Sequence, residues 1–287
     1  MVTKASLKLS LHNLDLDSLE ICGLKIDGIH GILHDEKLKP QTFEISGCLL
    51  GNLKRPAQSD NLQDTVDYSY LCDIARQIIG GPSKNLLETL AFEIAQNIAL
   101  YIAELSCHIW QVQITVEKVS PPVANLRAAK ATILVPVSRK AYLGLGSNLG
   151  DRWSFIRHAV QSLKGVVAVS PVYETEPIGG PDGQDPYLNL VIAVETAETP
   201  FELLNTVRKI EEDAKRERKQ RWGARTLDID ILTIGNLQVN SPNLEVPHPR
   251  MFDRKFVLVP LRDLNPELIS DKMINFAIGD VTCVGTI

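Results

Sequence analysis

The spacing of apolar residues along the chain alternates between two periods, one typical of strands and one typical of helices. Strict alternation of apolar and polar residues predicts a strand at 109–118 (IWQVQITVEK), with every second side chain on one buried face. Apolar or alternating runs predict further strands after Gln41, up to Val137, from Ala141, and at 187–196 and 226–234. Helical spacing is present in TVDYSYLCDIARQII, NLLETLAFEIAQNIALYIAEL, DRWSFIRHAVQSLKG and PFELLNTVRKIEEDAKRE.

The order of these elements predicts two α+β domains. The first half runs strand, strand, helix, helix, strand, strand, and the second half also mixes strands and helices, so we expect an antiparallel sheet carrying two helices in each. A polar link after Val137 places the boundary near Ser138 and the domains at 1–137 and 138–287. A length of 287 residues is comfortable for two domains.

Composition argues against several classes of partner. The net charge of −5 does not suit nucleic acid or an anionic membrane surface, and no apolar run reaches the ~18 residues of a membrane span. The start, MVTKASLKLSLHNLD, lacks the continuous apolar core of a secretory signal. The five cysteines are scattered without a CxxC pair, which indicates reduced thiols in a cytoplasmic setting rather than disulfides or zinc.

Two aspartates interrupt the apolar strand predicted at 226–234. Residues two apart in a strand share a face, so Asp228 and Asp230 would project together while Ile229 and Ile231 face the core. Their Cα atoms would lie ~6.6 Å apart, and such a pair suits Mg²⁺, which prefers a few carboxylates together with substrate phosphates. A solvated strand face is an equally good interpretation of the pair taken alone.

Basic residues crowd the segment before these aspartates, at Lys215, Arg216, Arg218, Lys219, Arg221 and Arg225. Beside an acidic pair they would supply the anion clamps that a magnesium-bound polyphosphate requires. Two alternatives stay open: an ordinary solvated cluster, and an RNA-binding surface with salt-sensitive affinity. Trp222 could stack on a planar ring or simply pack. The chain has neither GxxxxGKS nor GxxxxGKT, which argues against a P-loop enzyme.

Two glycine-containing segments of the second half are expected to be loops. GLGSNLGD (144–151) follows a predicted strand and is too long for the GxGxxG dinucleotide fingerprint, so a tight turn with Asp151 at the start of a helix is the better interpretation. PIGGPDGQDPYLN (177–189) suits a mobile lid or else an ordinary surface loop.

Lys118 is the most informative position of the first half. It continues the apolar face of the strand at 109–118 to the rim, where desolvation favours a neutral amine that can act as a base; an amine that extends to solvent is the plainer alternative. Glu88 fits a capping box with Asn85 as N-cap, unless it contacts a ligand. Taken alone, Tyr68 suits a core tyrosine and Glu36 a loop acid.

The second half resembles the 6-hydroxymethyl-7,8-dihydropterin pyrophosphokinase family over about residues 140–267. The stretches that carry the resemblance are AYLGLGSNLGDR, SPVYETEPIGGPDGQDPYLN, RWGARTLDIDIL and VPHPRMFDRKFVLVPL. The resemblance implies a ferredoxin-like α+β fold and transfer of pyrophosphate from ATP to a pterin hydroxymethyl group with two Mg²⁺ ions.

The same resemblance implies roles for individual residues. The metal ligands would be Asp228 and Asp230, and Arg216 and Arg225 would take part in catalysis. The ATP contacts would be Glu211, Arg218, Arg221, Trp222, His248 and Arg254. The pterin pocket would be formed by Thr175, Pro177, Ile178, Tyr187, Asn189 and Phe256.

The first half resembles the dihydroneopterin aldolase family over about residues 18–135, through IHGILHDEKLKPQTF, DNLQDTVDYSYLCDIA, KNLLETLAFEIA and VEKVSPP. The resemblance implies a tunnelling fold whose subunits combine into ring-like barrels with pterin sites at subunit borders. Glu88 would anchor the amino-pyrimidine edge of the pterin, and Lys118 would transfer the proton of a retro-aldol cleavage. Tyr68 would assist proton delivery, and Glu36 would order water or substrate hydroxyls. No metal is implied in this half.

The product expected of the first half is the substrate expected of the second half. The hypothesis is therefore a bifunctional enzyme of folate synthesis, homo-oligomeric through its first domain, that uses pterins, ATP and Mg²⁺ and neither nucleic acid nor membranes. The alternative keeps the pyrophosphokinase and makes the first half a non-catalytic oligomerisation module.

Overall fold

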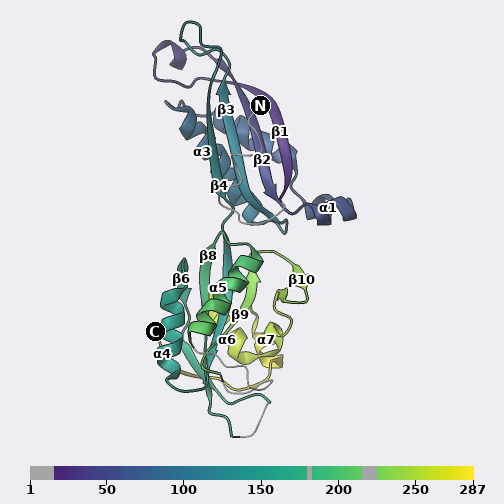
Figure 1. Cartoon of the computed structure of the whole chain (residues 1–287), viewed down its shortest axis with the longest axis vertical. Coiled ribbons are helices and arrows are strands. Elements are labelled where there is room, and N and C mark those ends of the chain that lie inside the picture. Colours follow the sequence, from purple (N-terminus) through teal and green to yellow (C-terminus); the bar gives the residue numbers. More distant parts are fainter. Residues whose placement is uncertain (1–15, 180–182, 215–224) are drawn as a thin grey trace. The chain divides into compact units, whose positions relative to one another are not determined.

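The computed structural model describes residues 16–179, 183–214 and 225–287. Its chain divides into two units, one of residues up to Ile102 together with Cys107–Val137, the other of Ala103–Ser106 together with Ser138–Ile287 (Figure 1). Each unit is built on an antiparallel sheet with helices packed on it, so the predicted α+β class is confirmed.

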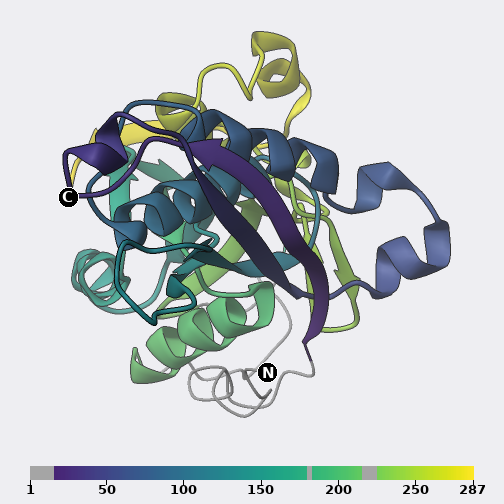
Figure 2. The same ribbon diagram turned by 90° about the horizontal axis from the view of Figure 1, so that it is seen from above.

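The first unit contains a four-stranded sheet in the order β1-β2-β3-β4, with each neighbouring pair antiparallel. Its strands are β1 (Asp17–Gly28), β2 (Gln41–Gly51), β3 (Ile109–Lys118) and β4 (Ala129–Pro136). Helices α2 (Tyr68–Ile79) and α3 (Leu87–Ala103), blue in Figure 2, lie along the sheet that begins with the purple β1. The connections contain η1 (Asp35–Lys37), α1 (Lys54–Ser59) and η2 (Leu62–Asp64).

The alternation predicted for β3 is present in the structure. Val112, Ile114 and Val116 are at most 2 % exposed, whereas the polar residues between them are half-buried. The apolar stripe of α3, which includes the fully buried Ile94, completes the core on this side. Because β3 keeps its alternation to the last residue, Lys118 also lies on the buried face of the sheet.

The capping box predicted for α3 is wrong by one residue. The helix begins at Leu87, and its first backbone hydrogen bond runs from the Leu90 N–H to the Leu86 carbonyl. Leu86 is therefore the N-cap residue and Glu88 occupies the second helical position, not the third. The Asn85 side chain is used elsewhere, because its Oδ1 accepts a hydrogen bond from Lys37 Nζ at 2.9 Å.

The second unit contains a six-stranded sheet in the order β12-β7-β8-β5-β9, with β6 paired to β8. The strands are β5 (Arg139–Ser147), β6 (Val166–Val169), β7 (Val172–Thr175), β8 (Tyr187–Thr196), β9 (Asp228–Ile234) and β12 (Thr282–Gly285). All neighbouring pairs are antiparallel, as expected for this half. A separate hairpin consists of β10 (Val239–Ser241) and β11 (Leu244–Val246).

Helices cover both faces of this sheet. Helix α6 (Lys255–Leu264) packs on the face that carries Tyr142, Val191 and Leu232, with η3 (Met251–Asp253) before it and α7 (Asp271–Phe276) after it. Helices α4 (Arg152–Ser162) and α5 (Pro200–Asp213) pack on the other face (Figure 1). Helix α6 covers only part of its face of the sheet. The cavity described below lies on the uncovered part of that face.

Local signals set the starts of α4 and α5 as predicted. Asp151 caps α4 by accepting the Ser154 N–H, and Gly150 adopts a left-handed φ of 71° in the turn before it. Thr199 and Glu202 form a capping box at α5, with Pro200 in its first turn.

Two further features of the folded chain concern its cysteines and its helices. The five cysteines are free thiols. Within the described ranges, the helices are too short or too polar for any of them to cross a lipid bilayer.

Candidate active site

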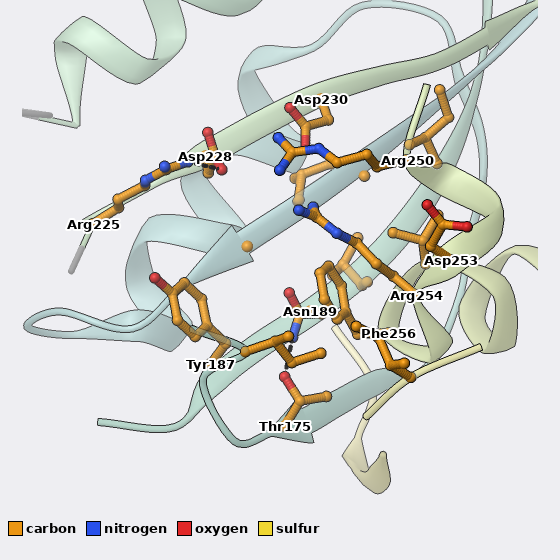
Figure 3. A pocket seen from close by; sticks show the side chains of 18 of the residues that line it. Thr175, Tyr187, Asn189, Arg225, Asp228, Asp230, Arg250, Asp253, Arg254 and Phe256 are labelled. Carbon is orange, nitrogen blue, oxygen red and sulfur yellow. Dashed lines mark hydrogen bonds and ion pairs between the residues drawn. The ribbon is translucent and has the colours of Figure 1, made fainter. Parts of the chain in front are cut away.

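A cavity of about 450 Å³ opens on the second sheet beside the start of α6 (Figure 3). Strands β5, β8 and β9 contribute its floor, and the end of β7 with the following loop and the segment 250–257 contribute its walls. The structure brings together many of the predicted site residues here, namely Thr175, Ile178, Tyr187, Asn189, Arg225, Asp228, Asp230, Arg254 and Phe256.

The two aspartates of β9 share the face of the strand that lines the cavity, as predicted. Asp228 pairs with Gly146 of β5 and Asp230 with Gly144, whereas Ile229 is 6 % exposed and faces the core. The aspartate side chains are 21 % and 41 % exposed, so both carboxylates can be reached from the cavity. The strand thus presents two acids to a ligand without burying either charge.

The glycines opposite the aspartates form the cavity floor, a role that the turn interpretation of GLGSNLGD did not predict. A Cβ on Gly146 would lie 3.1 Å from Asn189 Oδ1, and one on Gly144 would lie 3.5 Å from Leu232 Cδ2. Side chains here would occupy the space in front of Asp228 and Asp230. The strand alternation of Tyr142, Gly144 and Gly146 was the signal in the sequence that could have revealed it.

Arginines face the two carboxylates across the cavity (Figure 3). Arg225 forms an ion pair with Asp228, and Arg250 and Arg254 line the wall in front of α6. Burial, and then the charge of Arg250, lower the pKa of the Arg254 guanidinium, while Asp230 and Asp228 oppose this shift. Repulsion between cations that are partly removed from water makes this end of the cavity receptive to an anion. Arg250 was not among the predicted site residues.

His248 lies beside the acidic end but does not line the cavity itself. Its Nε2 is 4.0 Å from Asp230 Oδ1, and its Nδ1 accepts the Arg250 N–H at 3.3 Å. Burial, followed by the charges of Arg254 and Arg250, lowers the pKa of this imidazole from 6.5, so the neutral ring is favoured at pH 7.

The opposite end of the cavity combines a polar pair with apolar and aromatic side chains (Figure 3). Asn189 Nδ2 donates to Thr175 Oγ1 at 2.9 Å, and both residues are buried, which fixes the orientation of the amide. Tyr187, Phe256 and Ile178 surround this pair. Burial raises the pKa of the Tyr187 hydroxyl, which keeps it protonated. Pro177 does not line the cavity.

Asn148 ties two segments of the site together. It is 1 % exposed, and its Oδ1 accepts the Arg225 N–H at 2.8 Å while its Nδ2 donates to the Asp185 carbonyl at 3.1 Å. The Asn148 N–H also donates to the Arg225 carbonyl at 3.1 Å. One buried amide therefore holds both the arginine that pairs with Asp228 and the end of the loop before Tyr187.

Glu211, predicted as an ATP contact, has a backbone partner in the folded chain. It is 5 % exposed in α5, and its Oε1 accepts the Ile229 N–H at 2.8 Å, on the edge strand β9. It does not line the cavity. The carboxylate holds the backbone between Asp228 and Asp230.

Several predicted positions lie outside the described residues, namely Arg216, Arg218, Arg221 and Trp222. A cluster of three or more histidine, cysteine, aspartate or glutamate side chains able to hold a metal ion does not occur among the residues that are described. Asp228 and Asp230 are two carboxylates on one strand face that could hold a cation. That donor set fits Mg²⁺, which keeps several waters and binds one or two carboxylates with phosphates.

In the first unit the structure pairs Lys118 with Glu36, a contact that the sequence did not predict. Their side chains are only 8 % and 10 % exposed, and Lys118 Nζ lies 5.9 Å from the centre of the Phe43 ring. Burial alone would raise the pKa of the Glu36 carboxyl, but the hydrogen bonds from Lys118 and from the Leu33 N–H lower it overall. The pair is a buried acid and base at the rim of the sheet.

The other two predicted residues of the first unit are exposed. Tyr68 opens α2 with 62 % of its surface accessible, so it is not a core tyrosine. Glu88 is exposed in the first turn of α3. Lys37, which follows Glu36, reaches Asn85 in the segment before α3 and so links the two regions.

Comparison with known families accounts for both halves of the chain. Residues 142–266 match the model of the 7,8-dihydro-6-hydroxymethylpterin-pyrophosphokinase family, and residues 19–134 match the model of dihydroneopterin aldolase. These matches confirm the two folds that the sequence resemblances implied.

Among characterised relatives, the 2-amino-4-hydroxy-6-hydroxymethyldihydropteridine pyrophosphokinase of Bacillus subtilis is 44% identical over 129 residues, covering 43% of this chain and 77% of the relative. The bifunctional protein FolKE of Lactococcus lactis is 42% identical, covering 43% of this chain and 36% of that protein. A folic acid synthesis protein of Dictyostelium discoideum is 30% identical over 284 residues, covering 88% of this chain and 42% of that protein. The chain thus spans less than half of these last two proteins.

The solved structures that match the chain are more distant in sequence. The dihydroneopterin aldolase of E. coli, solved with neopterin, is 20% identical with a TM-score of 0.37, covering 42% of this chain and 98% of that one. A Plasmodium falciparum HPPK-DHPS structure is 17% identical with a TM-score of 0.35, covering 49% of this chain and 42% of that one. By the family matches and the Bacillus subtilis relative, and without support from these distant structures, the chain belongs to the 7,8-dihydro-6-hydroxymethylpterin-pyrophosphokinase family through its second half and joins to it a dihydroneopterin aldolase domain, so that two domains of folate biosynthesis are combined in one protein.

Proposed function

We propose that the second unit transfers pyrophosphate from magnesium-bound ATP to the hydroxymethyl group of 6-hydroxymethyl-7,8-dihydropterin. The observation that carries this proposal is the division of one cavity into two ends. Asp228 and Asp230 face Arg225, Arg250 and Arg254 at one end, and the other end has a fixed amide among apolar and aromatic side chains. A triphosphate and a flat heterocycle need these two environments side by side.

Asp228 and Asp230 would hold Mg²⁺ together with oxygens of the triphosphate. Bound there, the metal would neutralise charge on the phosphates and make the β-phosphorus more electrophilic. The family resemblance implies two such ions. The pairing of Arg225 with Asp228 supports a role in which Arg225 moves onto the phosphates once a cation occupies the aspartates.

The side chains would act by positioning and by charge. The pterin hydroxyl attacks the β-phosphorus, the bond to the α-phosphate oxygen breaks, AMP leaves, and the hydroxyl proton passes to solvent. No protein nucleophile takes part. Arg254, already partly desolvated, would stabilise charge on the phosphates, with Arg250 beside it. Arg216, Arg218, Arg221 and Trp222 belong to the same proposal through the family resemblance, as do ATP contacts from His248 and Glu211.

The end of the cavity that contains Asn189 would bind the pterin selectively. Asn189 keeps its carbonyl oxygen available because its Nδ2 is committed to Thr175, so it can accept hydrogen bonds from an amino-pyrimidine edge. Phe256 and Tyr187 supply aromatic surfaces that suit a flat ring, and Ile178 would border it. A pterin contact from Pro177 belongs to the proposal through the family resemblance alone.

We propose in addition that the first unit cleaves 7,8-dihydroneopterin by a retro-aldol reaction. Lys118 would act as the proton-transfer group, with Glu36 as its buried partner. Removal of a proton from the C2′ hydroxyl breaks the C1′–C2′ bond and releases glycolaldehyde. The electron pair is delocalised from C1′ into the pterin ring until the exocyclic C1′, which becomes the hydroxymethyl carbon, is protonated. Glu88 would anchor the pterin and Tyr68 would assist proton delivery.

The exposure of Tyr68 and Glu88 supports sites that are completed by a second subunit. Both residues sit on the exposed surface of helices in the monomer, where a ligand would remain half-solvated. A homo-oligomer formed through the first unit, as in the ring-like barrels of the family, would enclose them. The free cysteines agree with a cytoplasmic location.

The test is a two-step assay that starts from dihydroneopterin with ATP and magnesium. Glycolaldehyde and AMP should both appear, and glycolaldehyde alone should appear without ATP. AMP release from added hydroxymethyldihydropterin without any glycolaldehyde from dihydroneopterin would leave the alternative, a pyrophosphokinase with a non-catalytic first unit. RNA affinity of the second unit that is indifferent to the aspartates would favour an RNA-binding module instead.

A further inference from the structure

The segment after α7 runs back to the second sheet and closes one side of the cavity. Ile278 lines the cavity although it lies beyond residue 266, where the match to the family model ends. Four residues later the chain adds β12 to the sheet, with Thr282 opposite Glu174 and Cys283 opposite Tyr173. Strand β12 thereby covers the edge of β7, the strand that carries Thr175 into the cavity.

The backbone of Ile278 is fixed against the start of α6. Its N–H donates to the Asp253 carbonyl at 2.9 Å, and its carbonyl accepts the Lys255 N–H at 3.0 Å. These bonds form a parallel bridge with Arg254, and Asp280 lies 3.5 Å from Lys255 Nζ. The position of Ile278 is therefore coupled to the segment that presents Arg254 and Phe256.

The next residue packs against the loop on the other side of the cavity. Gly279 has a φ of +88°, and a Cβ added to it would lie 2.7 Å from Ile178 Cδ1. The end of the Ile178 side chain therefore lies directly on the backbone of the C-terminal segment, and the left-handed φ favours glycine there. The segment thus spans two walls of the cavity, one from α6 and one from the loop after β7.

The side chain of Ile278 has little to cover it in the monomer. It is 54 % exposed and Ile178 is 40 % exposed, although both line the same cavity near Phe256. A large apolar side chain gains free energy when a ligand removes its surface from water. Asp228, Asp230 and Arg225 lie at the other end of the cavity, whereas the Arg254 guanidinium lies over the Phe256 ring, 5.3 Å from its centre. Phosphate oxygens would gain nothing from apolar side chains, so the ligand surface that would cover these isoleucines is the ring.

We propose that Ile278 contacts the pterin ring and is a further residue that sets the affinity of the site for the pterin. Gly279 and β12 act as positioning elements that hold Ile278 and Ile178 on the same side of the ring. This inference rests on the proposed occupation of the cavity by a pterin.

The test compares Ile278→Ala with Phe276→Ala in the full-length protein. Phe276 is 79 % exposed two residues before Ile278 and does not line the cavity, so its truncation removes more apolar surface from the same segment without touching the site. The measurements are the KM values for hydroxymethyldihydropterin and for ATP, the Kd of the pterin by calorimetry, and glycolaldehyde release by the first unit.

Ile278→Ala should raise the KM and Kd of the pterin about tenfold, since it removes roughly two methylene equivalents of covered surface. The KM for ATP and glycolaldehyde release should stay within about twofold of the wild type. Gly279→Ala should raise the pterin KM as well, because its Cβ pushes Ile178 aside.

Three results would overturn the inference: an unchanged pterin Kd in Ile278→Ala, an equal rise of both KM values, or the same rise in Phe276→Ala. A wild-type protein that neither binds the pterin nor releases AMP would refute the proposed function, and the calorimetric Kd separates that outcome from a failure of the inference alone.

Discussion

Asn148 offers a sharp test of how the site is held together. Asn148→Ala removes the acceptor of the Arg225 N–H and the donor to the Asp185 carbonyl, at a position that is 1 % exposed. A typical hydrogen bond contributes about 1 kcal/mol, and a buried donor left without its partner costs about 1–3 kcal/mol. The second unit should therefore lose about 2–4 kcal/mol of stability, or about 5–15 °C in the Tm of its transition.

The effect on activity follows from what Asn148 holds. Arg225 loses its anchored backbone while Asp228 keeps its own place in β9, so phosphate contacts should weaken more than the fold does. At a temperature where the variant is folded, we expect the kcat/KM of pyrophosphoryl transfer to fall about 10- to 100-fold. This corresponds to a loss of about 1.4–2.8 kcal/mol of transition-state stabilisation.

Asn148→Asp distinguishes the contribution of the hydrogen bond to the Arg225 N–H from that of the hydrogen bond to the Asp185 carbonyl. It keeps an acceptor for the Arg225 N–H but places a carboxylate against the Asp185 carbonyl, so it should spare more of the ATP-dependent step than Asn148→Ala does. Calorimetric unfolding and AMP release measure the two effects, with the exposed Asn240→Ala as the control. Equal kcat/KM values for Asn148→Ala and wild type, at full occupancy of the folded state, would refute the reasoning.

Further predictions concern the charged residues of both units. Asp228→Asn should stop AMP release from ATP and pterin and leave glycolaldehyde release unchanged. Full retention of AMP release would refute the proposal that Asp228 is a metal ligand. Lys118→Ala should abolish glycolaldehyde release while pyrophosphoryl transfer continues, and cleavage that survives this change would exclude Lys118 as the base. The folded-state pKa of Glu36 is below its ordinary value of 4.5, so its pairing stabilises the protein above that pH and this contribution is lost as the pH falls through the lowered pKa. Glu36→Gln should therefore lower the Tm near neutral pH and make the Tm at about pH 7 more similar to the Tm at about pH 3. If the Tm difference between these two pH values is the same in the variant and the wild type, the carboxylate does not stabilise the protein through this pair.

The predictions that succeeded rest on local periodicity. The alternation that places Asp228 and Asp230 on one face of the strand and Ile229 on the other is visible in the seven residues DIDILTI, because neighbouring side chains of a strand point to opposite faces. The predicted start of α5 at Pro200 is similarly local, because proline suits the first turn of a helix. The predicted start of α3 is one residue early, and the Asn85 side chain expected to cap the helix instead accepts a hydrogen bond from Lys37 in a distant segment.

By itself, the sequence determined which faces of its strands are buried, where the helices begin in the second half, and which two carboxylates project together. Only the tertiary structure decided what those groups meet. Lys118 pairs with Glu36, 82 residues away, and Asn148 binds Arg225, 77 residues away, because strand order and register bring separate segments to one edge of a sheet. Apolar periodicity in the sequence predicts which side chains are buried, because it depends only on neighbouring residues. The partner that a polar side chain contacts depends on how the whole unit packs.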